Sequence, residues 1–166
     1  GSWALRLLGA RLVDGPSEVQ AKRGESEEGV LLEAGHDGYA KPFGLVHERR
    51  LLLSHDGTHL RGEDKLVPRD KATPHRFAVR FHLHPTVRVA REPDGTSALL
   101  TLPSGAIWRF RTDAALEVAD SVYLGHGDAI RKAHQLVICG VSGTEPVAVK
   151  WALKRAGEHD EEPAVN

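Results

Sequence analysis

The sequence predicts an all-β fold, an antiparallel β-sandwich of about ten short strands with little or no helix. Three observations lead to this prediction. Apolar and polar residues alternate over short segments, which is the period of a half-buried strand. Turn-forming residues, chiefly Asp-Gly and Pro-Ser-Gly, separate these segments at short intervals. No segment after Ser17 is a convincing amphipathic helix.

The clearest alternation runs from Phe77 to Pro85. One face of this predicted strand is apolar and is expected in the core: Phe77, Val79, Phe81 and Leu83. The other face carries a cation and two imidazoles: Arg80, His82 and His84. Pro85 closes the strand because it has no N–H for the ladder. The polar face is therefore a candidate for contact with a ligand, an anion or a metal.

The remaining segments are read as strands in chain order. Those before the strand that starts at Phe77 are residues 17–23, 30–34, 45–54 and 58–66, with a solvated turn at 25–29. Those after it are residues 86–91, 96–102, 106–111, 116–124, 131–141 and 146–154. Residues 67–75 form a charged, Pro-rich loop. Tight turns at Asp94-Gly95 and Pro103-Ser104-Gly105 make the segments from 86 to 111 a three-stranded meander.

Asp56-Gly57 is a strong signal for a hairpin with a two-residue loop. A two-residue loop fixes the register of the flanking strands, which places Arg50 opposite Glu63 and Arg49 opposite Asp64. Both are pairs of opposite charge, which supports this register. We interpret Arg49–Asp64 as a structural ion pair rather than a substrate contact.

The composition bounds the class of protein. The chain has 166 residues, of which 40% are hydrophobic and 27% charged, as expected of one globular domain. Its 22 Lys and Arg against 23 Asp and Glu argue against a nucleic-acid partner. There is no apolar run of membrane length, so no membrane partner is expected. Cys139 is the one cysteine and is expected in the core, and it does not decide between bacterial cytoplasm and periplasm.

The ends of the sequence are expected to lie outside the domain. Residues 1–2 have the character of a cloning remnant, and residues 156–166 form an acidic, flexible tail. Residues 3–16 are apolar without a clean period and fit a short helical turn or the end of an upstream element. The domain is therefore placed at residues 3–155. Since the chain contains no Met, we expect it to be part of a larger protein.

Several residues could carry chemistry. His82 and His84, as alternate residues of one strand, could flank one sugar, but the two alone lack the third ligand that zinc needs. The alternative is that they simply face water. Gly35 and Gly38 expose His36 and Asp37 at a strand end, which suits a metal ligand or an ordinary turn.

Two tryptophans have a structural interpretation, and the first of them also has a functional one. Trp108 with its arginine neighbours could stack on a sugar, although a core position is the commoner outcome for tryptophan. Trp151 shares its face with valines and is expected in the core. The sequence has no nucleophile elbow, phosphate-binding loop, dinucleotide fingerprint or Cys/His zinc spacing.

The order and spacing of several motifs resemble a known family. These motifs are His36–Tyr39, Phe43–Arg50, Asp56-Gly57, Gly62–Leu66 and Arg80–Pro85. Together they resemble the C-terminal β-sandwich part of bacterial heparinase II/III-like proteins, from about Trp3 to Arg155. The resemblance implies a polysaccharide lyase with an upstream helical toroid. Such enzymes cleave uronic-acid polysaccharides by β-elimination, with tyrosine and histidine of the toroid doing most of the chemistry.

The resemblance also implies roles for residues of this chain. The family's β domain has a zinc site of two histidines and an aspartate, and His36 matches its last ligand, while the other ligands would lie upstream of Trp3. Zinc is thus expected in the full-length protein and no cofactor in this chain. No catalytic residue is assigned here, and the chain alone is expected to show no turnover. Arg80, His82, His84 and Tyr39 are the candidates for contact with an acidic polysaccharide.

Two other functions stay open. The chain could be a non-catalytic carbohydrate-binding or scaffolding sandwich, which would bind acidic oligosaccharides without cleaving them. It could also be an interaction module, which predicts an exposed apolar patch where a partner docks. Heparan-like chains, alginate and a bacterial envelope polymer are all compatible substrates.

Overall fold

The computed structural model describes residues 15–69, 73–125 and 130–157. In this part of the chain there are eleven strands and one four-residue helix, α2 (Ala40–Phe43). The strands are β1 (Val19–Ser26), β2 (Gly29–His36), β3 (Leu45–Leu53), β4 (His59–Pro68), β5 (Arg76–His82), β6 (Arg88–Arg91), β7 (Ser97–Thr101), β8 (Ile107–Thr112), β9 (Leu116–Leu124), β10 (Ile130–Val141) and β11 (Val147–Arg155). The predicted all-β class is confirmed.

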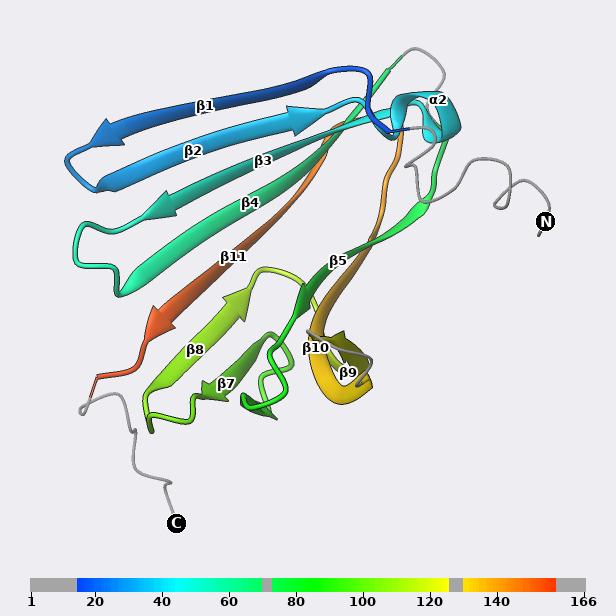
Figure 1. Ribbon diagram of the computed structural model, residues 1–166. Helices are drawn as coiled ribbons and strands as arrows, with labels where there is room; N and C mark the ends of the chain where they lie inside the picture. Colours follow the sequence, from blue (N-terminus) through cyan, green and yellow to red (C-terminus); the bar gives the residue numbers. More distant parts are fainter. Residues whose placement is uncertain (1–14, 70–72, 126–129, 158–166) are drawn as a thin grey trace.

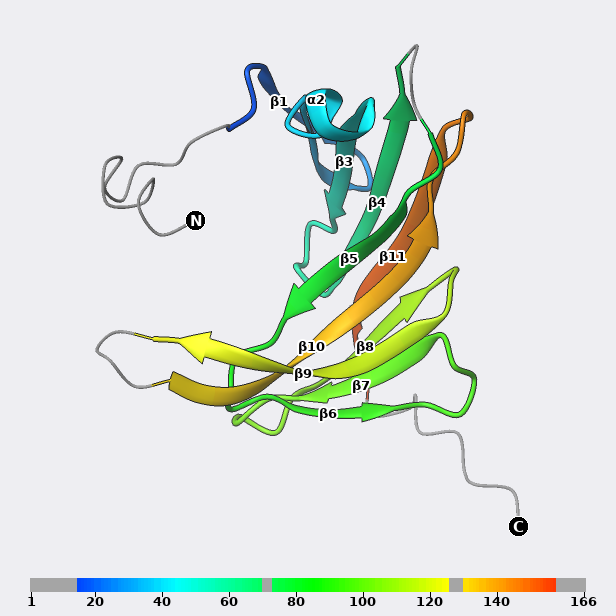
Figure 2. The same ribbon diagram turned by 90° about the vertical axis from the view of Figure 1, so that its right-hand side faces the viewer.

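The strands form two antiparallel sheets. The large sheet has the order β1-β2-β3-β4-β11-β8-β7-β6, and the small sheet has the order β5-β10-β9. The small sheet lies across one face of the large one, over the half that contains β11, β8 and β7 (Figures 1 and 2). Strands β1 and β2 extend beyond it, so their inner face has no second layer among the described residues.

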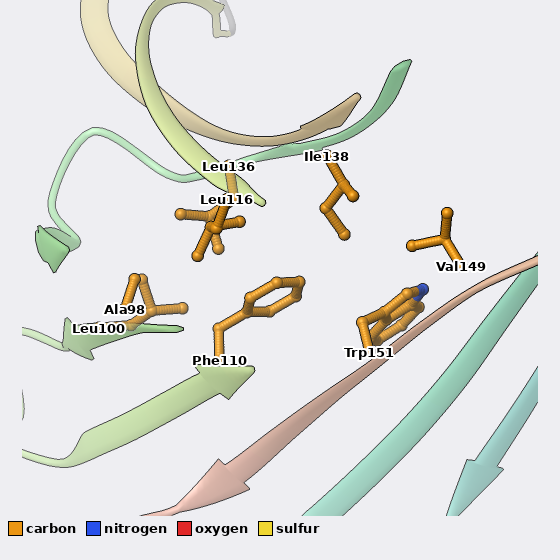
Figure 3. Packing of buried hydrophobic residues seen from close by; sticks show 8 residues of the cluster. All are labelled: Ala98, Leu100, Phe110, Leu116, Leu136, Ile138, Val149 and Trp151. Atoms are coloured by element: carbon orange, nitrogen blue, oxygen red, sulfur yellow. The ribbon is translucent and has the colours of Figure 1, made fainter. Parts of the chain in front are cut away.

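The core lies where the two sheets face each other (Figure 3). Its buried members come from both sheets: Ala98, Leu100, Phe110, Leu116, Leu136, Ile138, Val149 and Trp151. The ring of Phe81 packs 5.0 Å from Phe110 and 4.8 Å from Trp151, centroid to centroid. Each large side chain buried in this way contributes about 2 kcal/mol of hydrophobic stabilisation. The apolar face predicted for the strand that starts near Phe77 is therefore the face that closes the sandwich.

The predicted hairpin register is correct, but its loop is longer than expected. Arg50 lies opposite Glu63 and Arg49 opposite Asp64. Strand pairing nevertheless stops at Leu53, and the loop spans residues 54–58 instead of two residues. The Asp56 carboxylate explains the wider loop, because it accepts hydrogen bonds from the hydroxyl groups of Ser54 and Thr58 and from the amide of Thr58.

Three further expectations differ from the structure. Cys139 is exposed rather than buried, because it is the outward residue that follows the buried Ile138 on β10. Arg50 forms its ion pair with Glu33 of β2, 2.8 Å away, rather than with Glu63 across the hairpin. The solvated turn at 25–29 is shorter than predicted, since β1 continues to Ser26 and β2 starts at Gly29.

Some predictions concern the ends of the chain. Most of residues 3–16 and of the tail 156–166 lie outside the described residues. The last strand, β11, ends at Arg155. No helix in the described part of the chain has the length and apolarity that a bilayer crossing requires.

Candidate functional site

A polar cluster lies on the inner face of the large sheet, at the edge of the core. It comprises His36 of β2, His47 and Arg49 of β3, Asp64 of β4 and Trp151 of β11. The register brings them together, since His36 is opposite His47 and Arg49 is opposite Asp64. Cross-strand partners point to the same face, so a polar patch forms within an otherwise apolar layer.

Asp64 is the centre of this polar cluster. Its side chain is only 4% exposed, and three donors surround it. Oδ1 accepts from His47 Nε2 at 2.8 Å and from Arg49 Nε at 2.7 Å, and Oδ2 accepts from Trp151 Nε1 at 2.9 Å. Burial alone would raise the pKa of Asp64, but these hydrogen bonds and the Arg49 charge outweigh it and lower the pKa to about 2. The carboxylate is therefore ionised at neutral pH.

The two imidazoles form a chain of hydrogen bonds in which each ring donates to the next group, ending at Asp64. The amide N–H of Gly38 donates to His36 Nδ1 at 3.2 Å, so the proton of neutral His36 is on Nε2. His36 Nε2 lies 3.2 Å from His47 Nδ1, to which it donates, and His47 Nε2–H donates to Asp64. Burial and the neighbouring His47 lower the pKa of His36, which outweighs the opposing effect of Asp37. These tautomers satisfy every nitrogen of both rings.

This arrangement limits what the polar cluster can do. A general base needs an accessible lone pair, and neither imidazole has one while the chain of hydrogen bonds is intact. The cluster instead fixes the position of the strand end at His36 relative to β3 and β4. It thereby holds the segment 37–44, which carries α2, against the open end of the sandwich.

A cavity of about 310 Å³ lies at this end, between α2, the inner face of β3 and β4, and strand β5. We call it the end cavity. Its lining includes aromatic rings, imidazoles and guanidinium groups, among them Tyr39, Phe43, His47, His75, Arg49 and Arg76. Strand β5 pairs only with β10 among the described strands, so its other edge faces this cavity. Figure 1 shows α2 above β5 at the end where the two sheets diverge.

The rings around the end cavity contact one another edge to face. His36 lies 5.2 Å from Tyr39, and Phe43 lies 5.0 Å from His75, measured between ring centroids. Such geometry is favourable for aromatic pairs and limits ring rotation. Tyr39 and Phe43 are nevertheless 43% and 41% exposed. Two large rings are thus held in place and left open to solvent.

The residues predicted to contact substrate fall in different places. Tyr39 and Arg80 line the end cavity, although Arg80 Nη1 also reaches Gln135 of β10 at 3.4 Å. His82 shares the outer face of the small sheet with Arg80, because the two are alternate residues of β5, and its Nδ1 is 2.9 Å from Ser121 Oγ. His84 follows the end of β5 and packs its ring 5.0 Å from Tyr123. Of the three residues predicted to lie in a line, Arg80 and His82 are therefore in β5, and His84 lies beyond its end.

The residues described here do not assemble the zinc site that the resemblance implies. No group of three His, Cys, Asp or Glu side chains in the described ranges is placed to hold a metal. The nitrogens of His36 and His47 are close enough to share an ion, but Asp64 lies on the far side of His47, occupied by Arg49 and Trp151. A metal on His36 would also require its bond to His47 to break.

A second hollow, of about 590 Å³, lies on the outer face of β1 to β4. Its walls carry both signs of charge, including Glu33, Glu48, Arg50, Glu63 and Lys65. Arg50 is already paired with Glu33 at 2.8 Å. This hollow therefore offers no excess of charge to attract an ionic ligand, in contrast to the end cavity.

Sequence reasoning missed the contact between His36 and His47 and the donor role of Trp151. A signal existed for the first: if the strands that end near His36 and restart at Leu45 form a hairpin, the two histidines lie near each other at its closed end. A buried indole N–H also needs a partner, and Asp64 was the available acceptor. Phe43, His75 and Arg76 had no local signal, because α2 and the loop before β5 bring them to the cavity.

The fold and the site together define a class: a β-sandwich domain with an aromatic and cationic cavity at one end and no catalytic constellation of its own among the described residues. Residues 2–152 match the family described as "Heparinase II/III-like, C-terminal", and the chain belongs to this family. The family resemblance seen in the sequence is thereby confirmed.

Solved structures and a curated relative agree with this membership. Heparan sulfate lyase HepC from Pedobacter heparinus superposes with a TM-score of 0.70 at 10% identity, over 84% of this chain and 22% of that chain. A heparinase III, the BT4657 gene product, gives a TM-score of 0.68 at 11% identity with the same coverage. FtsZ-localized protein C of Caulobacter vibrioides is 42% identical over 161 residues, which are 91% of this chain and 28% of the relative. The chain thus spans about a quarter of the length of these proteins.

Proposed function

We propose that this chain is the β-sandwich domain of a protein that cleaves a uronic-acid polysaccharide by β-elimination, with the catalytic groups mostly outside the chain. The observation that carries the proposal is the family match over residues 2–152. The sandwich shared with a heparan sulfate lyase supports it at the level of the fold. In this proposal the domain contacts the acidic polymer, and an upstream helical toroid supplies the base.

The site chemistry agrees with this division of labour. β-Elimination needs a base for the C5 proton, a group that neutralises the sugar carboxylate, and an acid for the departing glycosidic oxygen. The imidazoles of His36 and His47 are engaged at every nitrogen and are poor candidates for the base. The guanidinium groups at the end cavity can meet a carboxylate or a sulfate. The domain is thereby suited to bind and orient, and not to abstract the proton.

The test compares this chain with a protein in which it follows its natural upstream sequence. Both are incubated with heparan sulfate, alginate and, as a neutral control, dextran, and the absorbance of the unsaturated uronate product is followed. We expect the longer protein to form product from one of the acidic polymers and this chain alone to form none. Product from this chain alone would place the base within it. No product from either protein would refute the elimination reaction for these polymers.

A second candidate is a non-catalytic scaffolding domain. Two observations favour it: the 42% identical relative is named for its localisation with FtsZ, and an exposed apolar surface lies beside the core. Val19, Leu32 and Leu53 are exposed on the inner face of β1 to β3, in register with buried residues of β4 and β11. An apolar sheet face without a second layer suits a protein contact.

Co-sedimentation with FtsZ polymers from the same organism tests this candidate. If the domain is a scaffold of this kind, it will pellet with the polymers, and Leu32→Gln will weaken the effect while the outward Leu52→Gln will not. Absence of the wild-type chain from the pellet would remove the support for direct contact through this domain.

A further inference from the structure

The end cavity combines features that recognise one particular kind of ligand. We propose that it binds a single acidic sugar residue, with the pyranose ring against Tyr39 and Phe43 and the carboxylate or sulfate directed to Arg49 and Arg76. This inference rests on the proposed function for the identity of the polymer, and it assigns the place where the polymer is held.

The aromatic part of the cavity is built rather than incidental. Both rings belong to the short segment that carries α2, and the carbonyl of Tyr39 accepts from the amides of Phe43 and Leu45 at 3.0 and 3.2 Å. Gly44 ends the turn with a φ of 67°, in the left-handed region where glycine is favoured. The backbone is therefore fixed while Tyr39 and Phe43 stay more than two-fifths exposed. Rigid, amphipathic rings open to solvent bind ligands at low entropic cost.

The described residues that line the cavity carry a net positive charge. Asp64 is the one carboxylate among them, and three donors already occupy it. Arg49 donates from Nε to Asp64, and its two η nitrogens have no hydrogen-bond partner in the described part of the chain. Arg76 begins β5 at the rim of the cavity, on the outward face of the strand, and its exposed side chain has no partner among the residues described. Guanidinium groups with free N–H donors bind carboxylates and sulfates through paired hydrogen bonds.

The size of the cavity limits its occupant. A volume of about 310 Å³ is at the lower end of the range of ligand pockets, which suits one sugar ring better than an extended oligosaccharide. The neighbouring residues of a polymer would run outward from the open end. The hollow of about 590 Å³ on the outer face of β1 to β4 has no exposed aromatic ring and no excess of positive charge among its described lining residues.

The experiment measures binding of a heparan sulfate hexasaccharide and of glucuronate by calorimetry, with a dextran oligosaccharide as the neutral probe. The variants are Arg76→Gln and Tyr39→Ala. Arg88→Gln is the matched control, because Arg88 also opens an exposed edge strand and has no side-chain partner in the described ranges. Loss of one charged hydrogen-bond partner predicts that Arg76→Gln weakens hexasaccharide binding about tenfold. We expect Tyr39→Ala to weaken binding of both acidic probes and Arg88→Gln to change it less than about twofold.

The outcomes separate this inference from the proposed function. Unchanged binding by Arg76→Gln and Tyr39→Ala overturns the inference, as does loss of binding in His82→Ala alone, which would place the ligand on the outer face of the small sheet. Failure of the wild-type chain to bind either acidic probe also overturns it, even if the longer protein cleaves the polymer. Binding at the end cavity without cleavage by the longer protein supports the inference and refutes the elimination reaction.

Discussion

Trp151 lies flat across Gly62 of the neighbouring strand, and the two residues fit only because Gly62 has no side chain. They are opposite each other in the pairing of β11 with β4. A Cβ placed on Gly62 would come within 2.2 Å of the indole carbon Cζ2. This position also lets the indole N–H reach Asp64, two residues further along β4, at 2.9 Å. Gly62 therefore allows Trp151 both to pack in the core and to donate the hydrogen bond from its indole N–H to Asp64.

Gly62→Ala is expected to destabilise the domain by roughly 2–4 kcal/mol, since the indole ring must move and its hydrogen bond to Asp64 is strained or lost. Urea unfolding followed by tryptophan fluorescence measures the effect. Gly24→Ala is the matched control, because Gly24 is also in a strand and no atom lies within 4 Å of a Cβ added there. The control is expected to change stability by less than about 1 kcal/mol. Equal stability of the two variants would contradict the packing of Trp151 on Gly62.

The buried carboxylate predicts a pH dependence at the acidic end. The pKa of Asp64 is lowered from 3.8 to about 2, so the unfolded chain takes up this proton before the folded chain does. The stabilisation from Asp64 is therefore complete above about pH 4 and is lost as the pH falls toward 2. It amounts to about 2 kcal/mol. Free energies of unfolding measured across this range are expected to fall more steeply in the wild type than in Asp64→Asn.

Asp64→Asn is also expected to be less stable than the wild type at neutral pH, by roughly 2–4 kcal/mol, because Arg49 loses its buried counterion. Glu63→Gln is the control on the adjacent, outward position, where the nearest cation is Lys150 Nζ at 3.9 Å. A partly exposed pair at this long distance contributes little, so we expect a change below about 1 kcal/mol. If Asp64→Asn kept both the wild-type stability and its pH dependence, the three-donor geometry would be wrong.

The imidazole chain predicts the titration of His36. Burial and the proximity of His47 lower the pKa of His36 below its ordinary value of 6.5. The unfolded chain thus binds this proton first, and the contribution of His36 to stability, present above pH 6.5, is lost as the pH falls through its folded pKa. NMR titration of the ring protons should give a midpoint below 6.5. In His47→Gln the midpoint should move upward; an unmoved midpoint would exclude coupling between the two rings.

The sequence carried most of the information about the fold and little about the site. Strict alternation around Phe81 and the Asp56-Gly57 turn were enough for the all-β class and for the register of Arg49 with Asp64. Those features are local, because side-chain direction in a strand has a period of two. The end cavity depends on how α2 and β5 approach each other across two sheets. That relationship is set by tertiary packing and leaves no spacing in the sequence.

Cys139 shows where local reasoning fails and leads to a last prediction. The apolar run Leu136–Cys139 reads as a buried strand, yet Ile138 faces the core and is fully buried, whereas Cys139 faces outward and is exposed. A thiol reagent should therefore label Cys139 in the native state without denaturant. The control is the double variant Ile138→Cys with Cys139→Ser, which moves the thiol to the buried position one residue earlier. In this variant labelling should occur only when the protein unfolds, because solvent does not reach the side chain at position 138. Protection of the wild-type thiol in the folded protein would mean that another layer covers this face of the small sheet.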